Sequence, residues 1–106
     1  MDATNEALRI QVLAVLDEVI DRLGRQDADY SYSSFASPES GIAEIDGYRD
    51  QFRAGVLRPV MLPLLFAPTG PIQEVAISSG WGDRFAELEA QIDAAFDQIQ
   101  AGPAAK

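Results

Sequence analysis

The stretch TNEALRIQVLAVLDEVIDRLG, Thr4 to Gly24, carries the strongest structural signal in the chain. On a helical wheel with about 100° per residue, its apolar side chains fall in one arc roughly 160° wide, and its acids lie opposite. We expect a helix with Thr4 as its N-cap that runs to about Leu23 and ends at Gly24. Because one neighbouring helix cannot cover so wide an arc, this helix is either central to the core or shared with a second subunit. The arc contains Leu8, Val12, Leu13, Val15, Leu16, Val19, Ile20 and Leu23.

Two further long helices follow from caps and spacing. Ser37-Pro38-Glu39 supplies an N-cap, a proline at the first helical position and a first-turn acid, and Gly55 is suited to be the C-cap after Ala54. The apolar stripe of this helix is narrow, which predicts a surface position with one buried edge. A last helix is expected from about 83 to 100, because apolar residues recur there at intervals of three and four. The two stripes are Ile42, Ile45, Tyr48 and Phe52, and then Phe85, Leu88, Ile92, Ala95, Phe96 and Ile99.

The middle of the chain, residues 56–82, carries a single base, Arg58, and a single acid, Glu74, which indicates a buried connection. Its first part cannot be an undisturbed helix, because Pro63 would clash with the carbonyl of the residue four positions earlier. A short helical turn over 63–67 or an extended apolar segment fits this part better.

Two structures compete for PIQEVAISS, residues 71–79. Pro71 at a first helical position and Gly80 as a stop favour a helix. Alternation of Val75 and Ile77 favours a strand, which would belong to a hairpin over about 62–78. The helix accounts for more of the residues, so it is our prediction. Trp81 in Gly80-Trp81-Gly82 would then lie between two helix ends and close the core.

The predicted fold is therefore all-α. We expect one compact domain over residues 1–106, built from three main helices and one or two short ones, with a frayed tail from about residue 101. The alternative is an α+β fold that contains the hairpin around 62–78.

Composition excludes several chemistries. The chain has no cysteine and no histidine, so a disulfide, a thiolate nucleophile, a cysteine-ligated metal site and an imidazole base cannot form within it. Asp27 to Ser33 alternates oxygen side chains as a calcium loop does, but Tyr32 and Pro38 stand where that loop requires glycine and glutamate. Gly80-Trp81-Gly82 lacks the spacing of a dinucleotide fingerprint.

The remaining acids give no sign of a reactive centre. Asp17, Glu18 and Asp21, and also Asp93 with Asp97, fall on the polar arcs of their helices, where solvated carboxylates are expected. We therefore predict no catalytic residue, no cofactor and no metal. None of these patterns identifies a family.

Charge points to the kind of partner. Seventeen acids against eight bases give a formal charge of −9, which repels nucleic acid and anionic lipid and attracts a cationic protein surface. The simpler interpretation is that this charge keeps the protein soluble. The N-terminal residues lack a basic-then-apolar secretion signal, so we expect a cytoplasmic protein that binds neither nucleic acid nor membrane.

The candidate interaction surface consists of Tyr30, Tyr32, Phe35 and Trp81. Tyrosine and serine together, as in DYSYSSF from Asp29 to Phe35, are favoured at recognition surfaces. The alternative is that these rings pack over the helices while the serines face water. Arg49, Arg53 and Arg58 are expected to pair with nearby acids such as Asp46 and Asp50.

We predict a non-enzymatic protein that acts by binding another protein. An inhibitor or immunity-type role towards a basic partner such as a toxin or nuclease fits the charge, and a homodimer through the first helix fits the wide apolar arc. The alternatives are a small carboxylate-dependent enzyme and a structural subunit of a larger assembly.

Overall fold

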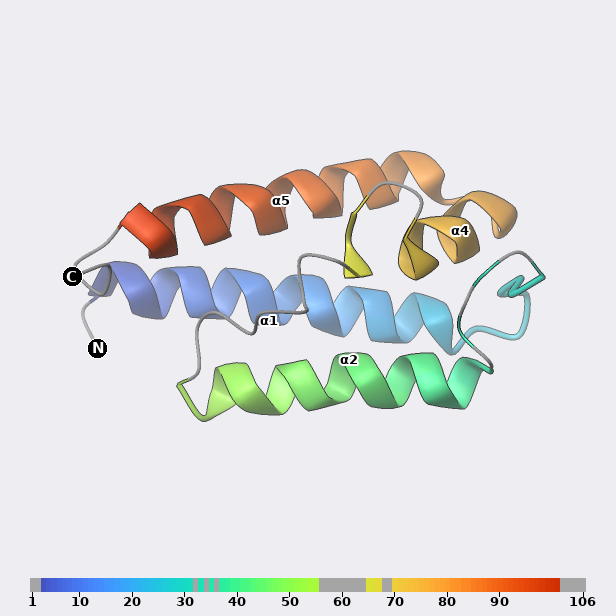
Figure 1. Ribbon diagram of the computed structural model, residues 1–106, viewed down its shortest axis with the longest axis horizontal. Coiled ribbons are helices and arrows are strands. Elements are labelled where there is room, and N and C mark those ends of the chain that lie inside the picture. Colours follow the sequence, from blue (N-terminus) through green and yellow to red (C-terminus); the bar gives the residue numbers. More distant parts are fainter. Residues whose placement is uncertain are drawn as a thin grey trace.

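The computed structural model describes residues 3–31, 33, 35, 37–55, 65–67 and 70–101. Regular structure in these residues is entirely helical, and they contain no strand, which confirms the all-α class. Figure 1 shows the helices, which are α1 (Ala3–Leu23), α2 (Pro38–Arg53), α4 (Pro71–Ser78) and α5 (Gly82–Ala101). The hairpin alternative is wrong, because residues 71–78 form α4. The expected frayed tail, residues 102–106, lies outside the described residues.

Most helix ends follow the predicted capping signals. Ser37 caps α2 through a reciprocal pair of bonds with Ser40, at 3.1 and 3.2 Å. At the other end of α2 the C-cap is Ala54 and not Gly55 as predicted; Gly55 is the next residue, with a positive φ of 96°. The prediction that Thr4 is an N-cap is wrong. The backbone is already helical at Ala3, so Thr4 lies inside the first turn of α1 and not at its N-cap position.

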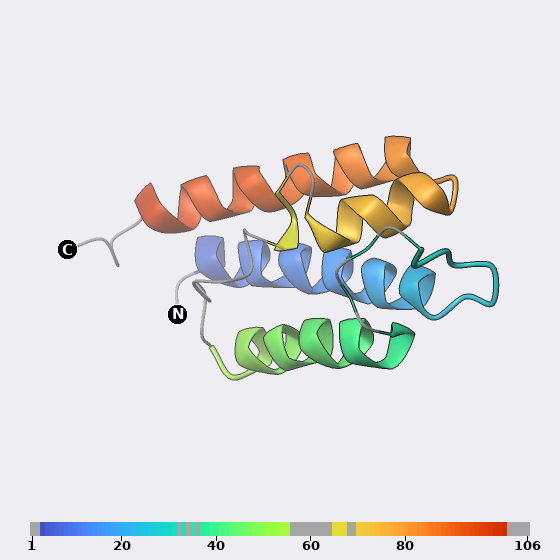
Figure 2. The same ribbon diagram turned by 45° about the vertical axis from the view of Figure 1, so that its right-hand side comes forward.

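Helix α1 occupies the centre of the bundle. Figure 1 shows α2 along one side of it and α5 along the other, both running antiparallel to α1, and Figure 2 preserves this arrangement. Phe52 of α2 and Phe96 of α5 approach to 6.2 Å between ring centroids, so the two outer helices also contact each other. The wide apolar arc of α1 is thus explained by several neighbours within one chain, the first of the two predicted alternatives.

The described part of the neutral middle packs into the same core. Leu65, Phe66 and the inward side of α4 are buried, and the ring of Phe66 stacks on Phe85 of α5 at 6.0 Å. Among residues 65–67 and 70–82 the prediction of a buried connection holds for Leu65, Phe66, Ile72, Val75, Ala76 and Trp81, whereas Ile77 is 63% exposed. Leu65 has helical backbone, while residues 63 and 64 of the expected short turn lie outside the described residues.

Candidate interaction surface

The aromatic residues proposed as a surface lie largely in the core. Phe35 and Trp81 are each 8% exposed, and Tyr30 is half-buried against them and their neighbours. Tyr30 and Phe35 lie together, with ring centroids 6.5 Å apart, whereas Tyr32 lies outside the described residues. The Tyr30 hydroxyl donates to the Leu23 carbonyl at 2.8 Å, which satisfies one of the free carbonyls at the end of α1. In this arrangement the rings offer little area to a partner.

The loop that carries these rings is attached to both ends of α4. The Asp29 N–H donates to Ser79 Oγ at 2.8 Å, where α4 ends, and the Ser33 hydroxyl donates to the Pro71 carbonyl at 3.0 Å, where α4 begins. Ser33 Oγ also accepts from the Phe35 N–H at 3.2 Å. The expectation that the serines face water is therefore wrong for Ser33. We call Asp29, Tyr30, Ser33 and Phe35 the strap.

Trp81 forms the joint between α4 and α5. Its backbone N–H donates to the Ala76 carbonyl at 2.8 Å, and the backbone N–H of Gly80 donates to the Ile77 carbonyl at 3.2 Å. The two bonds make a Schellman motif with Gly80 at a φ of 89°. The Trp81 carbonyl then accepts the first helical bond of α5, from Phe85 at 2.9 Å. The predicted place of Trp81 between two helix ends is confirmed. Gly80 is needed here because a side chain at this φ would be strained.

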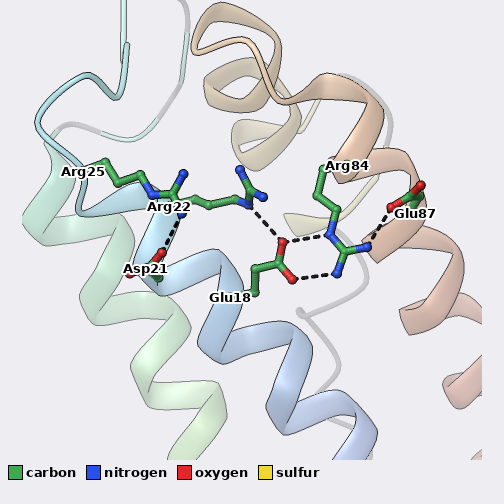
Figure 3. A network of polar contacts seen from close by, with 6 residues as sticks. All are labelled: Glu18, Asp21, Arg22, Arg25, Arg84 and Glu87. Carbon is green, nitrogen blue, oxygen red and sulfur yellow. Dashed lines mark hydrogen bonds and ion pairs between the residues drawn. The ribbon is translucent and has the colours of Figure 1, made fainter.

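Glu18 is the centre of an ion-pair network between α1 and α5, shown in Figure 3. Arg84 reaches across from α5 and donates to both Glu18 oxygens, from Nε at 2.8 Å and Nη2 at 2.7 Å. Arg22 donates to the same carboxylate at 3.0 Å, and Arg84 also contacts Glu87 at 2.7 Å. These bonds, with Arg84 the largest cause and partial burial opposing, lower the pKa of Glu18 to about 2.

Glu18 corrects the expectation that the acids of α1 are solvated and without a role. Its side chain is only 27% exposed, and it connects two helices. The pairing with Arg22 could be found from the four-residue spacing, but the pairing with Arg84 joins residues 66 positions apart and leaves no local pattern. Arg22 has a second contact, with its guanidinium 5.1 Å from the centre of the Trp81 ring.

Every arginine that the structure describes contacts a carboxylate. As predicted, Arg49 pairs with Asp46 and Arg53 with Asp50, and Arg49 also bridges to Asp17 of α1 at 2.7 Å. Arg58 lies outside the described residues. The remaining pairs are Arg9 with Glu6, Arg22 and Arg84 with Glu18, Arg25 with Asp21, and Arg84 with Glu87.

Helix α5 presents an exposed face that holds acids and alanines. We call it the α5 outer face, and it spans an arc of about 120° and a length of roughly 21 Å. Within the described residues, no basic side chain pairs with Asp83, Asp93 or Asp97 on this face. The face consists of Asp83, Ala86, Glu87, Ala90, Asp93, Ala94 and Asp97, all exposed.

The described residues show no feature of a buried polar site, a metal site or a membrane span. None of their buried side chains is polar or charged, and no group of three or more potential metal ligands gathers among them. Of the described helices, none combines the length and apolarity that crossing a bilayer requires. Comparison with protein-family models, curated proteins and solved structures found no match to this chain.

Proposed function

We propose that this protein binds a basic protein partner through the α5 outer face, in the manner of an inhibitor or immunity-type protein. The observation that carries the proposal is the distribution of pairing. The described arginines are all neutralised by acids of the same chain, while Asp83, Asp93 and Asp97 have no described basic partner. Asp27, Glu39 and Glu44 are exposed and likewise have no described basic partner, but the three acids of α5 lie on one side of one helix, where a cationic surface can approach them together.

The spacing of these acids supports the same proposal. Asp93 and Asp97 stand four residues apart on one exposed side of α5, a like-charge pair that destabilises a helix by roughly 0.2–0.5 kcal/mol. Lysine or arginine from a partner would offset this repulsion. The row Ala86, Ala90 and Ala94 between the acids has no long side chains, so another backbone can approach α5 closely.

The proposal includes the remaining features expected from the sequence. The chain acts as one compact bundle of three long helices with one or two short ones, in the cytoplasm, and without catalytic activity or a cofactor. A homodimer is less well supported, because packing within one chain accounts for the apolar arc of α1, and Ile10 and Ile77 are the large apolar side chains that the described surface exposes. The enzyme alternative requires at least two acids away from solvated faces, and no observation favours it.

The experiment compares two triple variants of equal charge. Asp83→Asn/Asp93→Asn/Asp97→Asn alters the α5 outer face, and Asp27→Asn/Glu39→Gln/Glu44→Gln alters exposed acids elsewhere. Each triple removes one first-turn acid, Asp83 or Glu39, so the effects on the helix dipole are matched. Each variant and the unaltered protein serve as bait in a lysate of the native cell.

We expect one basic protein to be retained by the unaltered bait and by the control triple, to be lost with the α5 triple, and to be released by added salt. If the basic protein is still retained by the α5 triple, or is not released by added salt, the proposal is refuted. So would recovery of nothing beyond the bait itself.

A further inference from the structure

Ile77 is a large apolar side chain that the packing of this chain leaves in solvent. It lies near the end of α4 and is 63% exposed, whereas Ile72, Val75 and Ala76 of the same helix are buried. Isoleucine is also a weaker helix former than alanine, because its branched side chain loses rotamer freedom in a helix. At this position it therefore contributes little to the stability of the fold.

The side chain of Ile77 lies against the start of α5. A Cβ atom added at Gly82 would lie 3.3 Å from Ile77 Cγ1, so the bare backbone of Gly82 leaves the room that the side chain occupies. On a wheel of about 100° per residue, Gly82 falls about 20° from Asp93 and about 40° from Ala86, at one edge of the α5 outer face. Ile77 thus adjoins the N-terminal end of that face, where α4 leads into α5 (Figure 1).

Acids without a described basic partner flank Ile77 on both helices. Glu74 lies three residues earlier on α4, a spacing that makes two side chains neighbours on a helix surface, and Asp83 follows Gly82 directly. Neither carboxylate pairs with an arginine among the described residues. An apolar centre with a polar rim is the usual composition of a protein interface.

Ile10, the other large apolar side chain that the described surface exposes, has different surroundings. It is 56% exposed on α1, and every described acid of that helix contacts an arginine of this chain. A single exposed isoleucine is common on protein surfaces and needs no partner to explain it. The acids beside Ile77 are what favour a cationic partner at that position.

We infer that Ile77 is the apolar anchor of the interface with the basic partner, and that this partner presents a large apolar side chain flanked by lysine or arginine. The apolar side chain packs on Ile77 and Gly82, while the cations meet Glu74 and the acids of the α5 outer face. The inference rests on the proposed function for the charge of the partner. It supplies the apolar contact that the α5 outer face lacks, because alanine is the only apolar residue of that face.

The test measures the affinity of the basic protein retained by the bait, once identified and purified, for single variants at the two exposed isoleucines. Ile77→Gln removes the apolar surface and keeps a side chain suited to a helix, and Ile10→Gln makes the same change on α1. We expect Ile77→Gln to weaken binding about tenfold, since most of this side chain is free to be buried in the complex. Ile10→Gln and the apolar variant Ile77→Leu should bind like the unaltered protein.

Urea denaturation separates a lost contact from a lost fold. Because Ile77 is largely exposed, Ile77→Gln should unfold at nearly the same urea concentration as Ile10→Gln. Salt gives a second readout. The factor lost with Ile77→Gln should stay constant as salt is added, because an apolar contact is not screened, whereas the factor lost with the α5 triple should shrink.

The outcomes separate this inference from the proposed function. If Ile77→Gln binds like the unaltered protein while the α5 triple does not bind, the anchor is refuted and the proposed function stands. Equal weakening by Ile77→Gln and Ile10→Gln would also refute the anchor. Undiminished binding by the α5 triple would refute the proposed function, and this inference with it.

Discussion

Gly41 and Gly47 are two glycines of the same helix with opposite surroundings. Both lie inside α2, where alanine is favoured over glycine by roughly 1 kcal/mol in an open position. Gly47 has nothing within 4 Å of an added Cβ, whereas Gly41 faces the ring of Phe35. The two sites therefore separate helix propensity from packing.

We predict that Gly47→Ala stabilises the protein by about 0.5–1 kcal/mol and that Gly41→Ala does not. Displacement of the Phe35 ring should cost about 1–3 kcal/mol, which exceeds the gain in propensity. Urea denaturation of both variants measures the difference. Equal stabilisation by the two alanines would mean that the ring of Phe35 does not pack against Gly41.

Glu18 should make stability depend on pH. Its folded-state pKa of about 2 lies below the ordinary value of 4.5, so the ionised group stabilises the fold above about pH 4.5 and loses this effect as the pH falls towards 2. We predict that Glu18→Gln lowers the free energy of unfolding by about 1 kcal/mol near neutral pH, and that its difference from the unaltered protein shrinks near pH 2.

Urea denaturation across this pH range provides the measurement, since urea adds no ionic strength. Asp21→Asn is the control, because its pair with Arg25 is well exposed and should contribute little at any pH. A Glu18→Gln penalty that stayed constant down to pH 2 would show that the charge of Glu18 is not what joins α1 to α5.

Helix α5 should carry a stability cost that matches its proposed role. Its last turn has no basic residue, and Asp97 lies near the negative end of the helix dipole and four residues after Asp93. We predict that Asp97→Lys raises the free energy of unfolding by roughly 0.5–1 kcal/mol and weakens binding of the basic partner. Thermal unfolding and the bait experiment measure the two effects. Asp97→Lys that left the partner bound would place the interface elsewhere.

The helices could be predicted because their signals are local. Helix α2 was predicted from Ser37-Pro38-Glu39, and α5 from its apolar residues at intervals of three and four. Helix α4 was predicted correctly in place of a strand, because Pro71 and Gly80 are suited to begin and end a helix. The strap and the Glu18 network could not be predicted, because Ser33–Pro71 and Glu18–Arg84 join residues 38 and 66 positions apart. Such pairs become visible only when the helices are packed.

The aromatic rings illustrate the same limit. Sequence placed Trp81 at the joint of two helices, since glycines on both sides of it mark a turn. It could not show that Tyr30 and Phe35 pack inward, because a tyrosine–serine segment is equally suited to a surface and to a covering loop. The ring of Phe35 packs against Gly41, and nothing in the sequence around Gly41 indicates that contact.

The position of α1 between α2 and α5 bears on the state of association. Because its apolar arc is covered within one chain, we predict a monomer, and sedimentation equilibrium at micromolar concentration should give a mass near 11.5 kDa. Twice that mass would revive the homodimer. Ile10→Gln, on the exposed side of α1, would then show whether that helix forms the contact.

The central helix also has a consequence during synthesis. Helix α1 precedes both of its neighbours in the chain, and α5 begins 59 residues after α1 ends, a gap that a ribosome translates in roughly 3–12 s. During that interval the apolar face of α1 that α5 later covers is exposed in the nascent chain. We therefore expect the yield of this protein to depend on how α1 is protected during synthesis, either by a chaperone or by the rate at which the segment after α2 is translated.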